Sequence, residues 1–198
     1  CISGITFSNT GSVSIVAKCS HCVPVKSPNA IFVGNNSVNI SASMCSTPIF
    51  YFPTGSDNTV TFKNIKGDIV LHGGTSPITS NVDKLDINGD GGLVLEMEDY
   101  VPCVIADYVD INVKGDITAN IKSILFYVGY NTNLTAKNIN ITKVSSDGSP
   151  LFSKAVKIAA TGDVVIDGGG DMIVSDGPFE ASAKSMSVKT TSTGAPMF

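Results

Sequence analysis

The residues that could do chemistry in this chain are six carboxylates between positions 83 and 99. They are Asp83, Asp86, Asp90, Glu96, Glu98 and Asp99. Glu96 and Glu98 alternate with apolar residues, so both are expected on the solvent-facing side of one strand. Two carboxylates whose pKa values differ can share general acid and general base work in polysaccharide cleavage. A solvated acidic surface would carry the same residues, and the sequence favours this second interpretation.

The usual partners of catalytic carboxylates are missing from the sequence. Arginine, tryptophan and glutamine do not occur, and the two histidines, His21 and His72, are far apart in the chain. A Gly-x-Ser-x-Gly motif is also absent. Among the five tyrosines, Tyr127 and Tyr130 could project near each other and stack on a sugar, although tyrosines more often pack in a core or at its rim. We therefore expect no catalytic residues, no cofactor and no enzymatic activity.

The elements that must position these residues follow from a repeat. An apolar-x-apolar pair recurs eight times, and the first members of successive pairs lie 22 to 30 residues apart. The pairs are Val13/Ile15, Val38/Ile40, Val60/Phe62, Leu85/Ile87, Val109/Ile111, Leu134/Ala136, Val156/Ile158 and Met186/Val188. A period of this size is typical of units that cannot bury an apolar face alone and therefore stack on one another.

Each unit contains further strand signals. A later apolar cluster usually begins with proline, as in Pro102-Cys-Val104, and several units insert a segment opened by Gly-Asp, as in Gly115-Asp-Ile-Thr118. Three short strands per unit, separated by Gly, Asn, Asp and Pro corners, are indicated. The sequence thus predicts an all-β parallel β-solenoid of about eight coils, each of roughly 22–30 residues, with coils about 4.8 Å apart. We expect residues 1–198 to form one domain, either complete or a segment of a longer solenoid.

In the period of its repeat, and in the apolar pairs and proline-led clusters that recur with it, the chain resembles the parallel β-helix superfamily. This superfamily includes pectate lyases, polygalacturonases, phage tailspikes and surface adhesins. For the enzymes, this resemblance implies clustered aspartates, a basic residue that binds a uronate, and often an arginine as the base. The chain has no arginine, and its nearest match to Gly-His-Gly is His72-Gly-Gly74. The resemblance therefore supports the fold more than an enzymatic function.

Five cysteines can be placed in the frame of the repeat. Cys19 and Cys45 follow Val13 and Val38 by six and seven residues, so they are expected on the same edge of adjacent coils, within reach of a disulfide. We predict Cys19–Cys45 and Cys1–Cys22 disulfides, with Cys103 buried and unpaired. Swapped connectivity, free buried thiols, and a zinc site that uses Cys19, His21, Cys22 and Cys45 stay open as alternatives. Disulfides would place the chain in an oxidising compartment.

Two further motifs have weak signals. Asp167-Gly-Gly-Gly-Asp171 is similar to a calcium-binding repeat, but it occurs once and is more typical of a bulging turn. Four Asn-x-Ser/Thr glycosylation sequons are present, and their asparagines are Asn35, Asn39, Asn133 and Asn140. About this many sequons would arise by chance in a chain so rich in Asn, Ser and Thr. We expect no metal site.

Composition narrows the classes of partner. The net charge of −4 with scattered signs offers no basic surface for nucleic acid, and no apolar run is long enough to span a membrane.

We expect a non-enzymatic extracellular or cell-surface protein with a structural or adhesive role. It is expected to self-associate end to end into a filament through its terminal coils, or to bind a cell-surface or glycan partner. The alternative is a carbohydrate-binding or acidic-polysaccharide-degrading β-helix domain.

Overall fold

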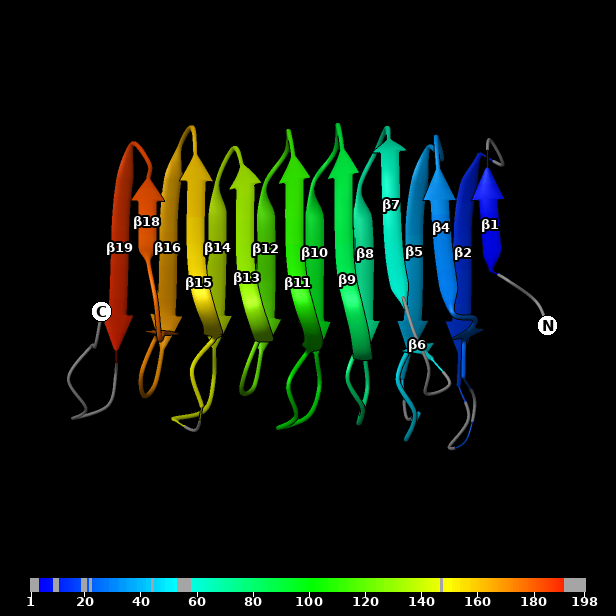
Figure 1. Cartoon of the computed structure of the whole chain (residues 1–198), viewed down its shortest axis with the longest axis horizontal. Coiled ribbons are helices and arrows are strands. Elements are labelled where there is room, and N and C mark those ends of the chain that lie inside the picture. Colours follow the sequence, from blue (N-terminus) through cyan, green and yellow to red (C-terminus); the bar gives the residue numbers. More distant parts are fainter. Residues whose placement is uncertain are drawn as a thin grey trace.

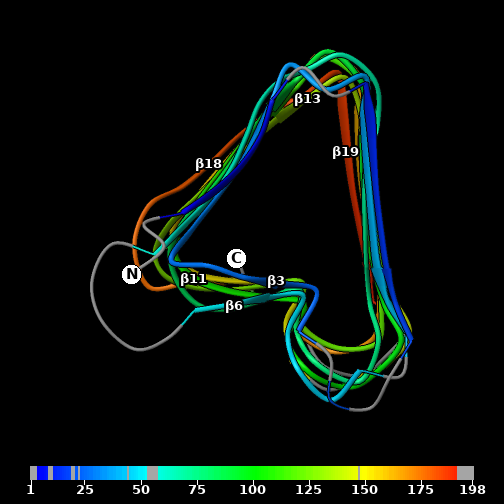
Figure 2. The ribbon, with the colours of Figure 1, turned by 90° about the vertical axis from the view of Figure 1, so that its right-hand side faces the viewer.

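The protein is a stack of parallel strands wound as a β-solenoid. The computed structural model describes residues 4–8, 11–18, 21, 23–43, 45–52, 58–146 and 148–190, which contain nineteen strands and no helix. Strands follow one another along the long axis of the molecule (Figure 1). Viewed along that axis, the coils superpose into a three-sided outline (Figure 2). Among the described residues no helix is long and apolar enough to cross a membrane.

One side of the solenoid is an eight-stranded parallel sheet, here called sheet B. Its strands are β2 (Ser12–Ala17), β5 (Ser37–Ala42), β8 (Ile69–Gly73), β10 (Leu93–Met97), β12 (Ile117–Ile121), β14 (Ile139–Lys143), β16 (Asp163–Gly168) and β19 (Ser185–Thr190). They pair in that order, each with the strand of the next coil. Eight such strands bound seven complete turns, one fewer than the eight coils expected from the repeat, because each apolar pair marks a strand and not a turn.

The other two sides belong to an eleven-stranded sheet, here called sheet A. Its strands are β1 (Ile5–Ser8), β3 (Val25–Lys26), β4 (Asn29–Val33), β6 (Phe50–Tyr51), β7 (Thr59–Ile65), β9 (Thr79–Gly89), β11 (Val104–Val113), β13 (Phe126–Ala136), β15 (Leu151–Ala160), β17 (Ile173–Ser175) and β18 (Phe179–Ser182). The long strands β11, β13 and β15 turn a corner where their pairing slips in register. The three strand segments expected per coil are therefore present, with two of them merged into one bent strand in these coils.

The core lies inside the three sides and follows the alternation of each strand. In β10, Leu93, Leu95 and Met97 are buried while the residues between them are partly exposed. Side chains in register also stack along the axis. The rings of Phe7, Phe32 and Phe62 form one column, with centroid distances of 4.9 and 4.7 Å. Stacked aromatic pairs add stabilisation beyond the area that they bury.

The repeat predicted from the sequence is real, but its pairs do not all belong to one sheet. Val13 and Val38 are in register in sheet B, and Met186 also lies there. The five intervening pairs lie in sheet A, beginning with Val60 in β7. Within sheet A, Leu134 is in register with Ile111 and not with Val109. The repeat therefore misaligned the pair that begins at Leu134 by two residues. Strands of both sheets share the same apolar-x-apolar pattern, and periodicity alone does not distinguish them.

Glycines allow adjacent coils to approach closely at one corner. A Cβ atom added to Gly91 would collide with the backbone of Gly67, and one added to Gly115 would lie 2.7 Å from the backbone of Gly91. Beside these glycines, the Asp116 carboxylate accepts hydrogen bonds from the backbone N and Nδ2 of Asn138, at 3.2 and 2.8 Å. The corner is thus held by side-chain bonds from one coil to the next.

Candidate functional site

The six carboxylates predicted as a cluster do not converge on one point. Asp83 accepts a hydrogen bond from the backbone N–H of Asn58 at 2.7 Å, and Asp99 accepts one from the next backbone N–H in the chain. Asp86 and Asp90 form separate surface ion pairs with lysines, Lys84 and Lys114 respectively. Only Glu96 and Glu98 share a partner. The structure therefore reduces the candidate cluster to these two residues.

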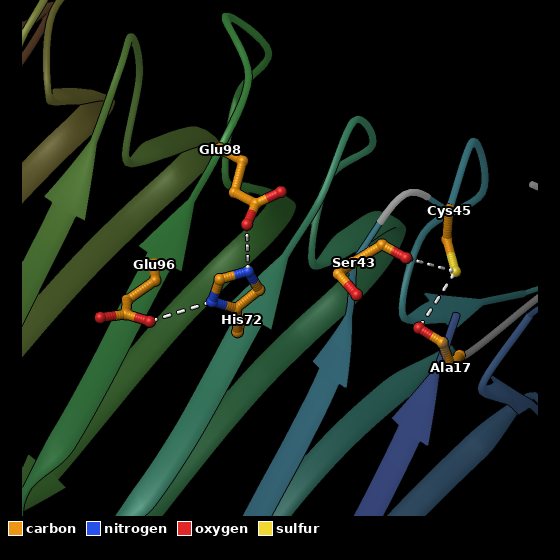
Figure 3. Close-up of polar contacts among 6 residues, drawn as sticks. All are labelled: Ala17, Ser43, Cys45, His72, Glu96 and Glu98. Atoms are coloured by element: carbon orange, nitrogen blue, oxygen red, sulfur yellow. Dashed lines mark hydrogen bonds and ion pairs between the residues drawn. The ribbon is translucent and has the colours of Figure 1, made fainter. Parts of the chain in front are cut away.

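Glu96 and Glu98 hold the two nitrogens of one imidazole ring. His72 lies on β8 and is in register with Glu96 on the neighbouring strand β10. Its Nδ1 is 3.0 Å from Glu96 Oε2, and its Nε2 is 2.9 Å from Glu98 Oε1 (Figure 3). The His72 side chain is 24% exposed, and the two glutamates are about half exposed. The ring thus sits between the carboxylates on the outer face of sheet B.

The electrostatics of this group favour a charged imidazole. Partial burial lowers the pKa of His72, but the hydrogen bonds and negative charges of Glu96 and Glu98 raise it more, and the net direction is upward from 6.5. Sequence reasoning did not connect these residues. The available signal was spacing, because His72 precedes Glu96 by 24 residues, which is the length of one coil.

A polar row runs along sheet A that sequence reasoning also missed. It consists of residues in register from β7 to β18, and we call it the axial row: Thr61, Asp86, Asp110, Asn133, Lys157 and Glu180. Lys84 lies 3.0 Å from Asp86 and 3.8 Å from Asp110, so it bridges two members of the row. Lys157 and Glu180 form a further ion pair at 3.4 Å.

Two hollows open on the axial row. The first has a volume of about 400 Å³ and lies where the pairing of β7 with β9 shifts register, with Lys63 and Asn64 beside Thr61, Asp86 and Asn88. Asn64 has a φ of 55° at this register shift. The second measures about 210 Å³, and its polar lining residues are Asn131, Asn133, Lys157 and Glu180. Side-chain amides, a carboxylate and a lysine therefore line each hollow, with the Thr61 hydroxyl added in the first, as donors and acceptors for a polar ligand.

All five tyrosines are exposed, whereas such residues more often pack in a core or at its rim. Tyr108 stacks on Tyr130 with centroids 5.1 Å apart, and Tyr127 stacks on Phe152 at 5.0 Å. The Lys154 ammonium lies 5.9 Å from the Tyr130 ring centroid. Each ring thus uses a face against a neighbour in the stack. These stacks join neighbouring coils, and they occupy one face of each ring that a sugar could otherwise use.

The cysteine predictions have mixed outcomes. Cys103 is buried and free, which confirms that expectation, and burial raises the pKa of its thiol. Cys45 is also buried and free in the structure, and its Sγ lies 3.7 Å from the carbonyl oxygens of Ala17 and Ser43 (Figure 3). The structure thus gives no support for a Cys19–Cys45 disulfide. The predicted partners Cys1, Cys19 and Cys22 lie outside the described residues.

The weaker motifs lie apart from these sites, except for the sequon asparagine Asn133, which belongs to the axial row. Asn35 is fully buried, so its side chain has no room for a glycan, whereas Asn39 is exposed and Asn133 and Asn140 are partly exposed. The Asp167–Asp171 motif spans the end of β16 and a turn in which Gly170 has a φ of 75°. Over the described part of the chain, no group of three or more His, Cys, Asp or Glu residues is placed to hold a metal ion.

No family model, no curated protein and no solved structure matches the chain.

Proposed function

We propose that the protein is a non-enzymatic structural or adhesive β-solenoid that works outside the cell or at the cell surface. The observation that carries this proposal is the axial row, a polar line of registered side chains along one side of a regular rod. A row of this kind gives an extended partner a series of polar contacts at the strand spacing of about 4.8 Å. Parallel pairing of successive strands in register holds the members of the row in a fixed order along the rod.

A carbohydrate is the second candidate partner, and the two hollows favour it. The first lining combines Asn, Asp, Thr and Lys side chains and the second combines Asn, Lys and Glu, and such groups can bond to several hydroxyl groups of one sugar. Cleavage of a polysaccharide receives less support. Glu96 and Glu98 bind opposite nitrogens of His72, so the imidazole occupies the space between the two carboxylates.

Binding to the axial row is tested with paired variants on a glycan array and on immobilised acidic and neutral polysaccharides. Asn133→Ala combined with Lys157→Ala removes two members of the row. Asn120→Ala combined with Lys189→Ala removes the same residue types from sheet B as a matched control. We expect the first pair to abolish a binding signal that the control retains. Equal loss in both pairs, or no binding by the unaltered chain, argues against a glycan contact at this row.

Two further assays address the rest of the proposal. Incubation with the same polysaccharides should release no new reducing or unsaturated ends, and release of either would replace the non-enzymatic proposal. Surface labelling of intact cells that express the protein should modify its exposed lysines; labelling only after lysis would contradict a location at the surface.

End-to-end association stays a prediction. β2 and β19 lie at the two ends of sheet B, and pairing of such strands between copies would extend the sheet in register. Electron microscopy of the purified chain tests this, because filaments one rod wide would support association and isolated short rods would contradict it.

A further inference from the structure

We propose that His72, Glu96 and Glu98 form a proton-dependent clasp between β8 and β10, closed when the imidazole carries both protons and opened when it loses one. The clasp joins two successive coils on the outer face of sheet B. This proposal is independent of the function proposed above, because it concerns a device built into the fold and requires no partner.

The geometry requires two protons on the ring. A neutral imidazole has one N–H donor and one lone pair, whereas ionised carboxylate oxygens only accept hydrogen bonds. Both ring nitrogens of His72 lie at hydrogen-bond distance from a carboxylate oxygen, at 3.0 and 2.9 Å. With one proton, either Glu96 or Glu98 would face a nitrogen lone pair and be repelled. Only the imidazolium satisfies both contacts, and it also separates two carboxylates that are two residues apart.

The surroundings of His72 contain no competing charge in register. The strands that pair with β8 are β5 and β10. On β5, the residue in register with His72 is Ser41, which is not ionised. On the other side, the charged groups are Glu96 on β10 and Glu98 just after it. Both charges that act on the ring are therefore negative, and both favour the imidazolium.

The direction of the response to pH follows from these contacts. The pKa of His72 is raised in the folded chain from its usual value of about 6.5. The folded state therefore binds the proton more tightly than the unfolded state. The stabilisation from the clasp is fully present below about pH 6.5 and is lost as the pH rises through the raised pKa. Above that value one bond is replaced by a repulsion, and the contact between these two coils loosens.

The test is an NMR titration of the imidazole nitrogens in the full chain. The chain has two histidines, so the His21→Ala variant leaves the signal of His72 alone. We expect the midpoint to lie above 6.5, so that more than half of the rings carry both protons at pH 6.5. Glu96→Gln and Glu98→Gln should each lower the midpoint, since each removes a negative acceptor and keeps the side-chain shape.

Glu180→Gln is the matched control, because Glu180 lies on sheet A and pairs with Lys157. It should leave the His72 midpoint unchanged. A midpoint at or below 6.5, a single-proton ring at pH 6.5, or equal shifts in all three glutamine variants would overturn the clasp. If His21→Ala does not fold, loss of one of two signals in His72→Gln assigns the resonance in the unaltered chain, and the same outcomes decide.

Discussion

The rings of Phe32 and Phe62 lie parallel with their centroids 4.7 Å apart, although thirty residues separate them in the chain. The two residues are in register on β4 and β7, and both are fully buried. Their contact shows how the solenoid converts a sequence period into an axial column of packed side chains.

We expect Phe62→Ala to lower the free energy of unfolding by about 3–5 kcal/mol, through lost burial and the cavity left between Phe32 and the next coil. Phe152→Ala is a suitable comparison, because Phe152 stacks on Tyr127 at the surface and is only partly buried. Urea unfolding followed by circular dichroism measures both. Losses of equal size would show that the internal column contributes no more than the surface stack.

A second prediction concerns the glycine corner. Gly91→Ala should destabilise the chain by about 1–3 kcal/mol, because the new Cβ meets the backbone of Gly67, which cannot move without shifting a strand. Gly129→Ala should cost less, since its nearest neighbour is the Asp107 carboxylate, at 2.9 Å, and that side chain can rotate. Thermal unfolding of both variants checks this order. The reverse order would mean that the corner is not tightly packed.

The dependence of stability on pH is a third prediction. The unaltered chain should lose stability as the pH rises above about 6.5, to the extent that the folded-state pKa of His72 is raised, by about 1.4 kcal/mol for each pKa unit. His72→Asn should lack this loss, because it removes the titrating group. Urea unfolding at pH 6 and at pH 8 compares the two proteins, because at pH 9 the buried Cys103 thiol, whose pKa is also raised, would lower the stability of both. If the free energy of unfolding changed by the same amount with pH in the unaltered chain and in His72→Asn, the effect would belong to other groups.

A fourth prediction concerns the thiols. Cys45 and Cys103 should resist alkylation in the folded chain, since both are buried and burial raises the pKa of Cys103, which keeps its thiol protonated. Both should react fully in denaturant without reductant. Mass spectrometry of peptides after alkylation measures each site. A non-reduced peptide that links Cys45 to Cys19 would contradict the free Cys45 and restore the disulfide predicted from the sequence.

The two candidate sites differ in how far the sequence could predict them. The alternation of Leu95, Glu96, Met97 and Glu98 was enough to place both glutamates on one outer face. The partner of these glutamates was not visible, because His72 lies a full coil away and the exact coil length was unknown. The axial row could not be predicted from the sequence for the same reason. Its members are scattered over more than a hundred residues and are aligned only by strand register.

The sequence by itself determined the fold class, because a recurring apolar-x-apolar pair with glycine and proline corners can bury its apolar face only by stacking coils. It did not determine which pair belongs to which sheet. Successive residues in register in sheet B are 22 to 31 residues apart, and the longest step runs from Val38 to Ile69. Alternation is a local property of each strand, whereas register depends on the length of every corner between strands. Only the tertiary structure therefore placed His72 between Glu96 and Glu98 and aligned the row along sheet A.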